Sequence, residues 1–309
     1  AGADGAGRCR PAGGRRASLP LPAGCSVSRA AFVAALVRQA VTAGAAFVPR
    51  ASATLADHEA DHRRLALQCD GATHPVATRI VIDASGLRSP LRSRQPTYRE
   101  AVSHRARIGL GALVDDPPCA YEPGAIYMAA GDRGYVGAVR VEDGRLDVAA
   151  AVKPEYVRAC GGPGPAVGAL IRDAGLAAID GIEATDWRGT PALSRRPASV
   201  AEHRLFSVGD AAGYVEPFTG EGIAWALSGA AALAPIALDA ARDWSAEHAA
   251  RWTQAHRRRI GRRQLVCRGV KMILRRPRLT STLVRVLGAV PQLARPATAA
   301  INRPAVQRA

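Results

Sequence analysis

The sequence predicts an α/β protein, on the evidence of two strand-to-turn transitions and one region of alternating short strands. Residues 80–82 and 205–208 are apolar runs that each end in a turn of small residues, as buried strands do. In open α/β sheets, ligands bind at the edge where the carboxyl ends of the strands meet, so these two turns are candidate binding positions. Residues 96–200 instead contain several short strand-like runs with a hairpin turn at 142–144, which favours an antiparallel sheet. Helical patterns over 244–274, 279–287 and 291–301 close the chain.

The turn after residues 205–208 carries the strongest local signal. Gly209 and Asp210 follow the strand at once, and a long alanine-rich helix comes later. The motif is completed by five residues that lie between this turn and the body of the helix: Pro217, Gly220, Glu221, Gly222 and Ile223. Glycines let backbone N–H groups approach a flat ligand, and the positive end of the helix stabilises negative charge on it. Asp210 suits a sugar or polyol hydroxyl, because an ionised carboxylate only accepts hydrogen bonds. The alternative is a strand-to-helix connection without a ligand, and the Pro-x-x-Gly-Glu-Gly-Ile sequence at a fixed distance from Gly209 and Asp210 disfavours it.

This stretch resembles the second flavin-binding motif of the superfamily that includes p-hydroxybenzoate hydroxylase, geranylgeranyl reductases and flavin-dependent halogenases. The resemblance implies that Asp210, next to Gly209, binds the ribityl chain of FAD and that Pro217 lies by the isoalloxazine ring. It also implies that the turn at 220–223 delivers backbone N–H groups to the pyrimidine side of that ring. The implied fold is a Rossmann-like FAD-binding domain with an inserted antiparallel β-sheet substrate domain and C-terminal helices.

Two further motifs agree with the resemblance. Ser28 is a candidate N-cap for a helix that starts at Arg29, followed by a strand from residue 45. The helix is similar to the family's Ser-Arg-x-x-x-x-x-x-Leu segment, which implies that Arg29 contacts the phosphates or ribityl chain; a solvated face is the alternative. Residues 80–92 resemble the family's Ala-Asp-Gly-x-x-Ser-x-x-Arg motif, with Gly86 in a small-residue turn that leads into a short helix. Asp83 is expected to take part of the motif aspartate's role. The family also implies that the backbone near Ala53 meets the adenine.

These motifs divide the chain into domains. We expect the FAD-binding domain over 19–95 and 200–245, the substrate domain over 96–199 and a helical region over 246–309. Residues 1–18 are rich in Gly, Ala and Arg without periodicity and are expected to be disordered. The family opens with a strand, a G-x-G-x-x-G turn and a helix that bind the pyrophosphate. No such fingerprint is found, so we expect this first β-α unit, roughly half a domain, to be missing.

The amino-acid composition limits the kinds of partner and cellular setting to be expected. The formal charge is +16, but Lys153 and Lys271 are the only lysines, and this arginine bias without aromatic interleaving argues against nucleic acid. The six cysteines form no C-x-x-C pair, which supports neither a zinc site nor a disulfide framework and favours a reducing, cytoplasmic setting. Arginines crowd residues 257–276 beside apolar positions. This segment is either a solvated helix or a peripheral contact with an anionic membrane.

The function implied by the resemblance is an FAD-dependent oxidoreductase that uses NAD(P)H. It would either reduce a double bond or hydroxylate a small organic or lipid-like substrate through a flavin hydroperoxide, and the Pro-x-x-Gly-Glu-Gly-Ile form leans towards reduction. A halogenase is disfavoured because the Trp-x-Trp-x-Ile-Pro signature is not found. The pattern nominates no catalytic acid, base or metal ligand. The alternative from another class is a truncated, non-catalytic remnant that cannot hold FAD alone.

Overall fold

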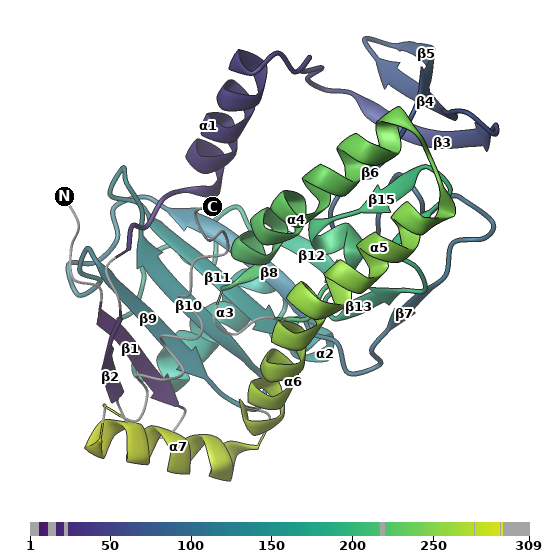
Figure 1. Ribbon diagram of the computed structural model, residues 1–309. Helices are drawn as coiled ribbons and strands as arrows, with labels where there is room; N and C mark the ends of the chain where they lie inside the picture. The colour runs from purple at the N-terminus through teal and green to yellow at the C-terminus, as the bar shows by residue number, and fades with distance from the viewer. Residues whose placement is uncertain are drawn as a thin grey trace. The chain divides into compact units, whose positions relative to one another are not determined.

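The computed structural model describes residues 6–11, 17–21, 24–216, 220–274, 276–290 and 292 (Figure 1). The chain divides into two compact units, each assembled from separate stretches of sequence. The first unit contains residues 1–45, 105–192 and 270–303, and the second contains residues 46–104, 193–269 and 304–309.

A seven-stranded sheet forms the first unit. Its strand order is β12 (Arg188–Ala192), β8 (Ile108–Val114), β11 (Leu146–Val152), β10 (Gly134–Arg140), β9 (Ala125–Ala130), β1 (Ala6–Pro11) and β2 (Ala17–Pro20). All neighbours pair antiparallel except β1, which runs parallel to β9. Leu146, Val148 and Val152 alternate along β11 and are fully buried in a cluster with residues of α3 (Pro163–Asp173). The antiparallel sheet predicted for this region and its 142–144 hairpin turn are therefore confirmed. A short helix, α2 (Pro154–Ala159), precedes α3, and α7 (Pro277–Ala289) packs against β1 and β2.

The prediction of disorder over residues 1–18 is wrong for the part that the structure describes. β1 pairs in register with both β2 and β9, with Ala6 opposite Pro20 on one side and Ala125 on the other. Strand pairing joins backbone N–H and C=O groups, so a segment without hydrophobic periodicity can extend an open sheet edge.

Helix α1 (Arg29–Thr42) begins where the sequence predicts. The Ser28 hydroxyl accepts a hydrogen bond from the Ala31 amide at 3.2 Å, which confirms Ser28 as the N-cap. The Ser28 hydroxyl and amide also donate to the Glu142 carboxylate, each at 2.6 Å, at the β10–β11 turn. This contact helps to explain why residues 19–45 group with the first unit, whereas the predicted division assigned them to the FAD-binding domain. The strand predicted from residue 45 is not formed.

Three small sheets occupy the second unit. β3 (Ser52–His58), β4 (Arg63–Cys69) and β5 (Ala72–Thr78) form an antiparallel meander, with Asp70 and Gly71 at the turn between β4 and β5. β7 (Glu100–Val102) pairs with β13 (Arg195–Pro197). The third sheet has the order β14 (Ala201–Glu202), β15 (Leu205–Ser207) and β6 (Val81–Asp83), and β6 runs parallel to β15.

Helices follow β15 in the second unit. A 3₁₀ turn, η1 (Gly209–Ala212), leads to α4 (Gly222–Arg242) and α5 (Ala246–His256). A π-helical turn, η2 (Arg257–Gly261), then joins α5 to α6 (Arg262–Leu274). The helix predicted over 244–274 is thus present, with an irregular turn inside it. The helix predicted over 291–301 lies outside the described residues, apart from residue 292.

Helix α4 packs along one side against the core of the second unit. Its Leu233 and Ile236 are buried in a cluster with Phe206 of β15 and Trp252 of α5. Among the described residues, α4 is also the one helix long and apolar enough to cross a membrane. Because the Phe206 cluster takes up one face of α4, this apolarity is explained there by core packing.

The short helix predicted after Gly86 is not formed. Arg88 and Ser89 have φ angles of 71° and 42°, in the left-handed region, so the chain turns there. A right-handed helix cannot pass through those two residues.

Candidate functional site

Two of the predicted site segments leave the same edge of one sheet. In the parallel pair, Ile82 of β6 lies opposite Phe206 of β15, and Asp83 lies opposite Ser207. The Val208 amide continues the pairing by donating to the Asp83 carbonyl at 2.9 Å. The turns that carry Gly86 and Gly209–Asp210 therefore both follow the carboxyl ends of neighbouring parallel strands, the edge at which open α/β sheets bind ligands.

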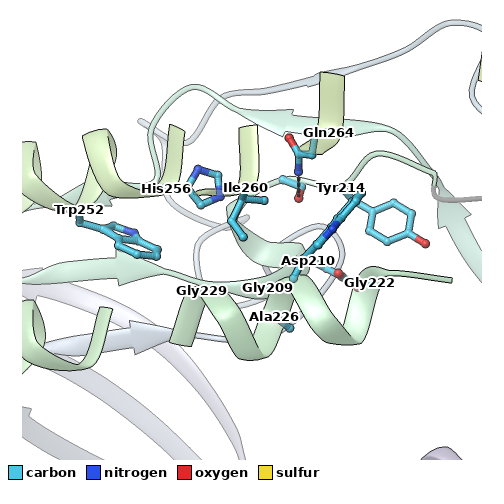
Figure 2. A pocket seen from close by; sticks show the side chains of 12 residues that line it. Gly209, Asp210, Tyr214, Gly222, Ala226, Gly229, Trp252, His256, Ile260 and Gln264 are labelled. Carbon is cyan, nitrogen blue, oxygen red and sulfur yellow. Dashed lines mark hydrogen bonds between the residues drawn. The ribbon is translucent and has the colours of Figure 1, made fainter. Parts of the chain in front are cut away.

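Gly209 brings the η1 turn close to helix α4. Its φ is 58°, which favours glycine, and a Cβ atom there would lie 3.4 Å from the Cβ of Ala226. Asp210 follows it on η1, half-buried beside a small cavity, as Figure 2 shows. The backbone conformation at Gly209 thus sets where the Asp210 carboxylate stands.

The N-terminus of α4 follows a glycine that has free space beside it. Gly220 has a φ of 75°, and no atom of the described residues, apart from its neighbours in the chain, lies within 4 Å of the position a Cβ would take. Gly222 begins the helix, no acidic residue stands in the first turn, and the N-cap Glu221 makes no side-chain cap. The first amides of α4 and their partial positive charge are therefore not neutralised by the helix's own side chains. Such an opening fits the electron-rich edge of a flat cofactor.

A small cavity, with room for about one water molecule, lies among η1, α4 and the α5–α6 segment (Figure 2). Trp252, His256 and Ile260 line it from the α5–α6 side. Burial lowers the pKa of His256 to about 4, so the imidazole is neutral at physiological pH. Trp225 of α4 also lines the cavity, and its Nε1 has no hydrogen-bond partner within the described part of the chain.

The carboxylate of Asp83 is used within its own turn. Asp83 is 1% exposed and accepts hydrogen bonds from the Ser85 amide at 3.0 Å, the Ser85 hydroxyl and the Ser89 hydroxyl. Both oxygens of Asp83 thus hold the Ser85–Ser89 turn, and its part in binding a cofactor remains a prediction.

Arg92, at the arginine position of the same motif, has a structural role. Its buried guanidinium donates to the Ser199 carbonyl at 3.0 Å and to the Ser207 hydroxyl at 2.9 Å, and it pairs with the Glu202 carboxylate. Arg92 thereby ties the segment after β6 to β14 and β15. The motif at 80–92 fixes the sheet edge on which the candidate site stands.

The second unit brings together most of the predicted site residues, and their roles towards a cofactor remain predictions. These are Gly86, Gly209, Asp210, Gly220, Glu221, Gly222 and Ile223. Ala53 lies on β3 in the same unit, half-buried against the apolar cluster of Leu55, Val81, Leu91 and Leu205. Arg29 is exposed on α1 of the first unit. Pro217 lies outside the described residues.

The sequence pattern missed the contribution of α6. Gln264 and Cys267 are buried and contact the Gly213 carbonyl and the Glu221 carboxylate. Both residues lie in a segment rich in arginines, and the arginine pattern indicates a solvent-exposed helix face. A buried helix face is normally recognised from apolar residues at helical spacing, and a glutamine and a cysteine do not add to such a pattern.

Comparison with known proteins identifies the fold. No protein-family model matches the chain, and no curated protein matches it. Among solved structures, a geranylgeranyl bacteriochlorophyll reductase-like protein from Thermoplasma acidophilum has a TM-score of 0.73 at 19% identity, covering 93% of this chain and 74% of that one. The p-nitrophenol 4-monooxygenase from Pseudomonas putida has a TM-score of 0.72 at 12% identity, covering 100% and 83%. A triple mutant of the flavin-dependent brominase Bmp2 has a TM-score of 0.71 at 16% identity, covering 96% and 82%.

These neighbours are FAD-dependent oxidoreductases and related flavin enzymes, and the chain has their fold. The three reactions named by these structures differ, while their TM-scores are nearly equal. The similarity therefore defines the class of fold and leaves the reaction to be argued from the site.

Proposed function

We propose that this protein is an FAD-dependent oxidoreductase that takes electrons from NAD(P)H. The observation that carries the proposal is the meeting of η1 and the α4 N-terminus within the second unit. Asp210 would accept hydrogen bonds from the ribityl hydroxyls, and the amides at 220–223 would face the pyrimidine edge of the flavin ring. When bound, FAD supplies the redox chemistry, and the protein supplies position and electrostatics.

The chain's own contribution at the ring is electrostatic. The positive end of α4 would stabilise negative charge at the N1–C2=O edge of reduced flavin. This stabilisation serves either of two reactions, reduction of a double bond or hydroxylation of a small organic or lipid-like substrate. Halogenation stays the disfavoured third reaction, because the tryptophan signature is not found in the sequence.

We further propose that a strand–helix unit, as at the start of the resembling family, completes the site. Phe206 is fully buried beneath α4, whereas Ile82, opposite it on the same sheet face, is 48% exposed. The flank of α4 also exposes Ile223, Leu227 and Leu238. Among the described strands, β6 pairs on one edge only. A strand beside β6 and a helix over Ile82 would cover these apolar groups and add a pyrophosphate-binding turn.

Flavin binding tests the proposal. The purified protein is expected to carry FAD or to bind it on addition, with the absorption of bound flavin. Asp210→Ala is expected to weaken FAD binding about tenfold to a hundredfold, because it removes a charge-assisted hydrogen bond. Asp57→Ala, at an exposed position of β3, is the matched control and should bind as the parent does.

Two results would decide against the proposal. If the parent protein binds no FAD at micromolar concentrations, this chain does not hold FAD by itself and the proposal fails for it. If Asp210→Ala binds FAD like the parent, Asp210 has no ribityl contact. Where FAD is bound, aerobic incubation with NADPH and candidate substrates separates the reactions by product mass, since hydroxylation adds one oxygen and reduction adds two hydrogens.

A peripheral membrane contact remains a second proposal, which would suit a lipid-like substrate. Arg262 and Arg268 of α6 are exposed, and so are the apolar Leu265 and Met272 of the same helix. Co-sedimentation with phosphatidylserine vesicles is expected at low ionic strength and should be lost at high salt. Arg262→Gln with Arg268→Gln should weaken it roughly tenfold or more, at about 1 kcal/mol per arginine. Equal binding to neutral phosphatidylcholine vesicles, or none to anionic ones, would end this proposal.

A further inference from the structure

One face of α6 reaches both turns of the proposed flavin site. The Gln264 side-chain amide donates to the carbonyl of Gly213, directly after η1, at 3.3 Å. The Cys267 thiol donates to the carboxylate of Glu221, the N-cap of α4, at 3.2 Å. The two donors stand three residues apart, so they project from one face of the helix. Both side chains are 8% exposed.

The π-helical turn η2 aligns this face with the site. A π turn holds one more residue than an α turn, and each residue of a regular helix rotates the chain by about 100°. Ile260 and Gln264, on either side of the end of η2, both point towards the η1 turn in Figure 2. Ile260 and Cys267 also share an apolar cluster with Val215 and Trp225. The π geometry of η2 thus takes up one residue and leaves these side chains of α6 facing the two turns.

The Cys267 contact controls where the Glu221 charge lies. Glu221 stands at the positive end of α4 and, if released, its carboxylate would be attracted to the amides that the flavin ring would use. The thiol holds the carboxylate on the α6 side. Burial and, secondly, the hydrogen bond with Glu221 raise the pKa of Cys267 to about 12. The thiol therefore keeps its proton across the physiological range and remains a donor.

We propose that Gln264 and Cys267 are positioning residues that hold the η1 turn and the α4 N-terminus in place for the flavin. Gln264 fixes the end of the turn that carries Asp210, and Cys267 keeps the Glu221 carboxylate away from the α4 amides. This inference rests on the proposed flavin site, and its contacts are made by the chain alone.

The first test compares FAD binding and flavin potential among variants of the whole protein. Gln264→Leu and Cys267→Ala are each expected to weaken FAD binding about fivefold, the worth of one hydrogen bond. Cys267→Ala should also make the bound flavin harder to reduce, because the Glu221 carboxylate loses the contact on its α6 side and its charge then opposes negative charge on the ring. Cys267→Ser keeps a donor and should restore both values, and Gln254→Leu, at an exposed position of α5, should change neither.

The second test needs no flavin. Amide hydrogen exchange of the unliganded protein is expected to quicken around 209–214 in Gln264→Leu and around 221–223 in Cys267→Ala, with Gln254→Leu unchanged in both turns. A parent that binds no FAD would overturn the proposed function, while the exchange data would still test the two contacts. Unchanged exchange in both turns, or a Cys267→Ser variant that behaves like Cys267→Ala, would overturn the positioning roles.

Discussion

Arg92→Met is expected to lower the free energy of unfolding of the second unit by about 3 kcal/mol. The guanidinium is 2% exposed and donates to the Ser199 carbonyl, the Ser207 hydroxyl and the Glu202 carboxylate. Methionine keeps most of the volume and leaves three buried or half-buried acceptors without their donor. The Glu202 side chain is 37% exposed, so water relieves part of its loss and the effect falls at the low end for a broken buried pair.

Urea unfolding followed by tryptophan fluorescence measures this loss. Trp225, Trp244 and Trp252 lie in the second unit and Trp187 in the first, so in a Trp187→Phe background the signal reports on the unit that contains Arg92. The control is Arg64→Met, which removes an exposed pair with Glu59 and should change the free energy of unfolding by less than about 1 kcal/mol. A value for Arg92→Met as small as that of the control would show that the buried network adds no stability.

Acid is expected to destabilise the protein through His256. Its pKa is about 4 in the folded chain, against an ordinary value of 6.5, because burial disfavours the imidazolium. Between these two values the unfolded state binds the proton and the folded state does not. Stability is therefore fully present above pH 6.5 and is lost as the pH falls towards 4, by up to about 3 kcal/mol.

Unfolding free energies measured from pH 7.5 to pH 4 check this slope. His256→Gln removes the titrating group and should flatten the profile over that window, whereas His74→Gln, at an exposed position of β5, should leave the slope of the parent. If the parent and His256→Gln lose stability in parallel, the carboxylates alone account for acid unfolding.

The parts of the fold that follow from local pattern were predictable. The run at 205–208, the glycines at 209 and 220 and the N-cap Ser28 each act on the backbone within a few residues of themselves, so local spacing reveals them. The antiparallel strands of the first unit show the same alternation in sequence as in burial. For this reason the sheet edge and the two turns of the candidate site are predictable from the sequence alone.

The errors arose where distant groups decide local structure. β1 follows from an open edge of β9, and the turn at 85–89 follows from serines that satisfy the buried Asp83. Neither leaves a trace in hydrophobic periodicity. The contacts of Gln264 and Cys267 depend on a π turn that no local pattern announces, and they come from polar residues within a basic segment.

The π turn also shows which property of residues 257–261 matters. Three of the five are arginines whose side chains are exposed, so their identity is of little consequence to the site. Their number matters in a different way. The five residues of this π turn rotate the chain about as far as four residues of an α-helix, so deleting one of the exposed arginines would leave a regular helix with Gln264 and Cys267 still facing the turns they contact. A residue deleted from α5, which is already regular, would instead rotate α6 by about 100° and take both side chains off those turns. Residues 257–261 can therefore change in composition, and even lose one arginine, without shifting the inner face of α6.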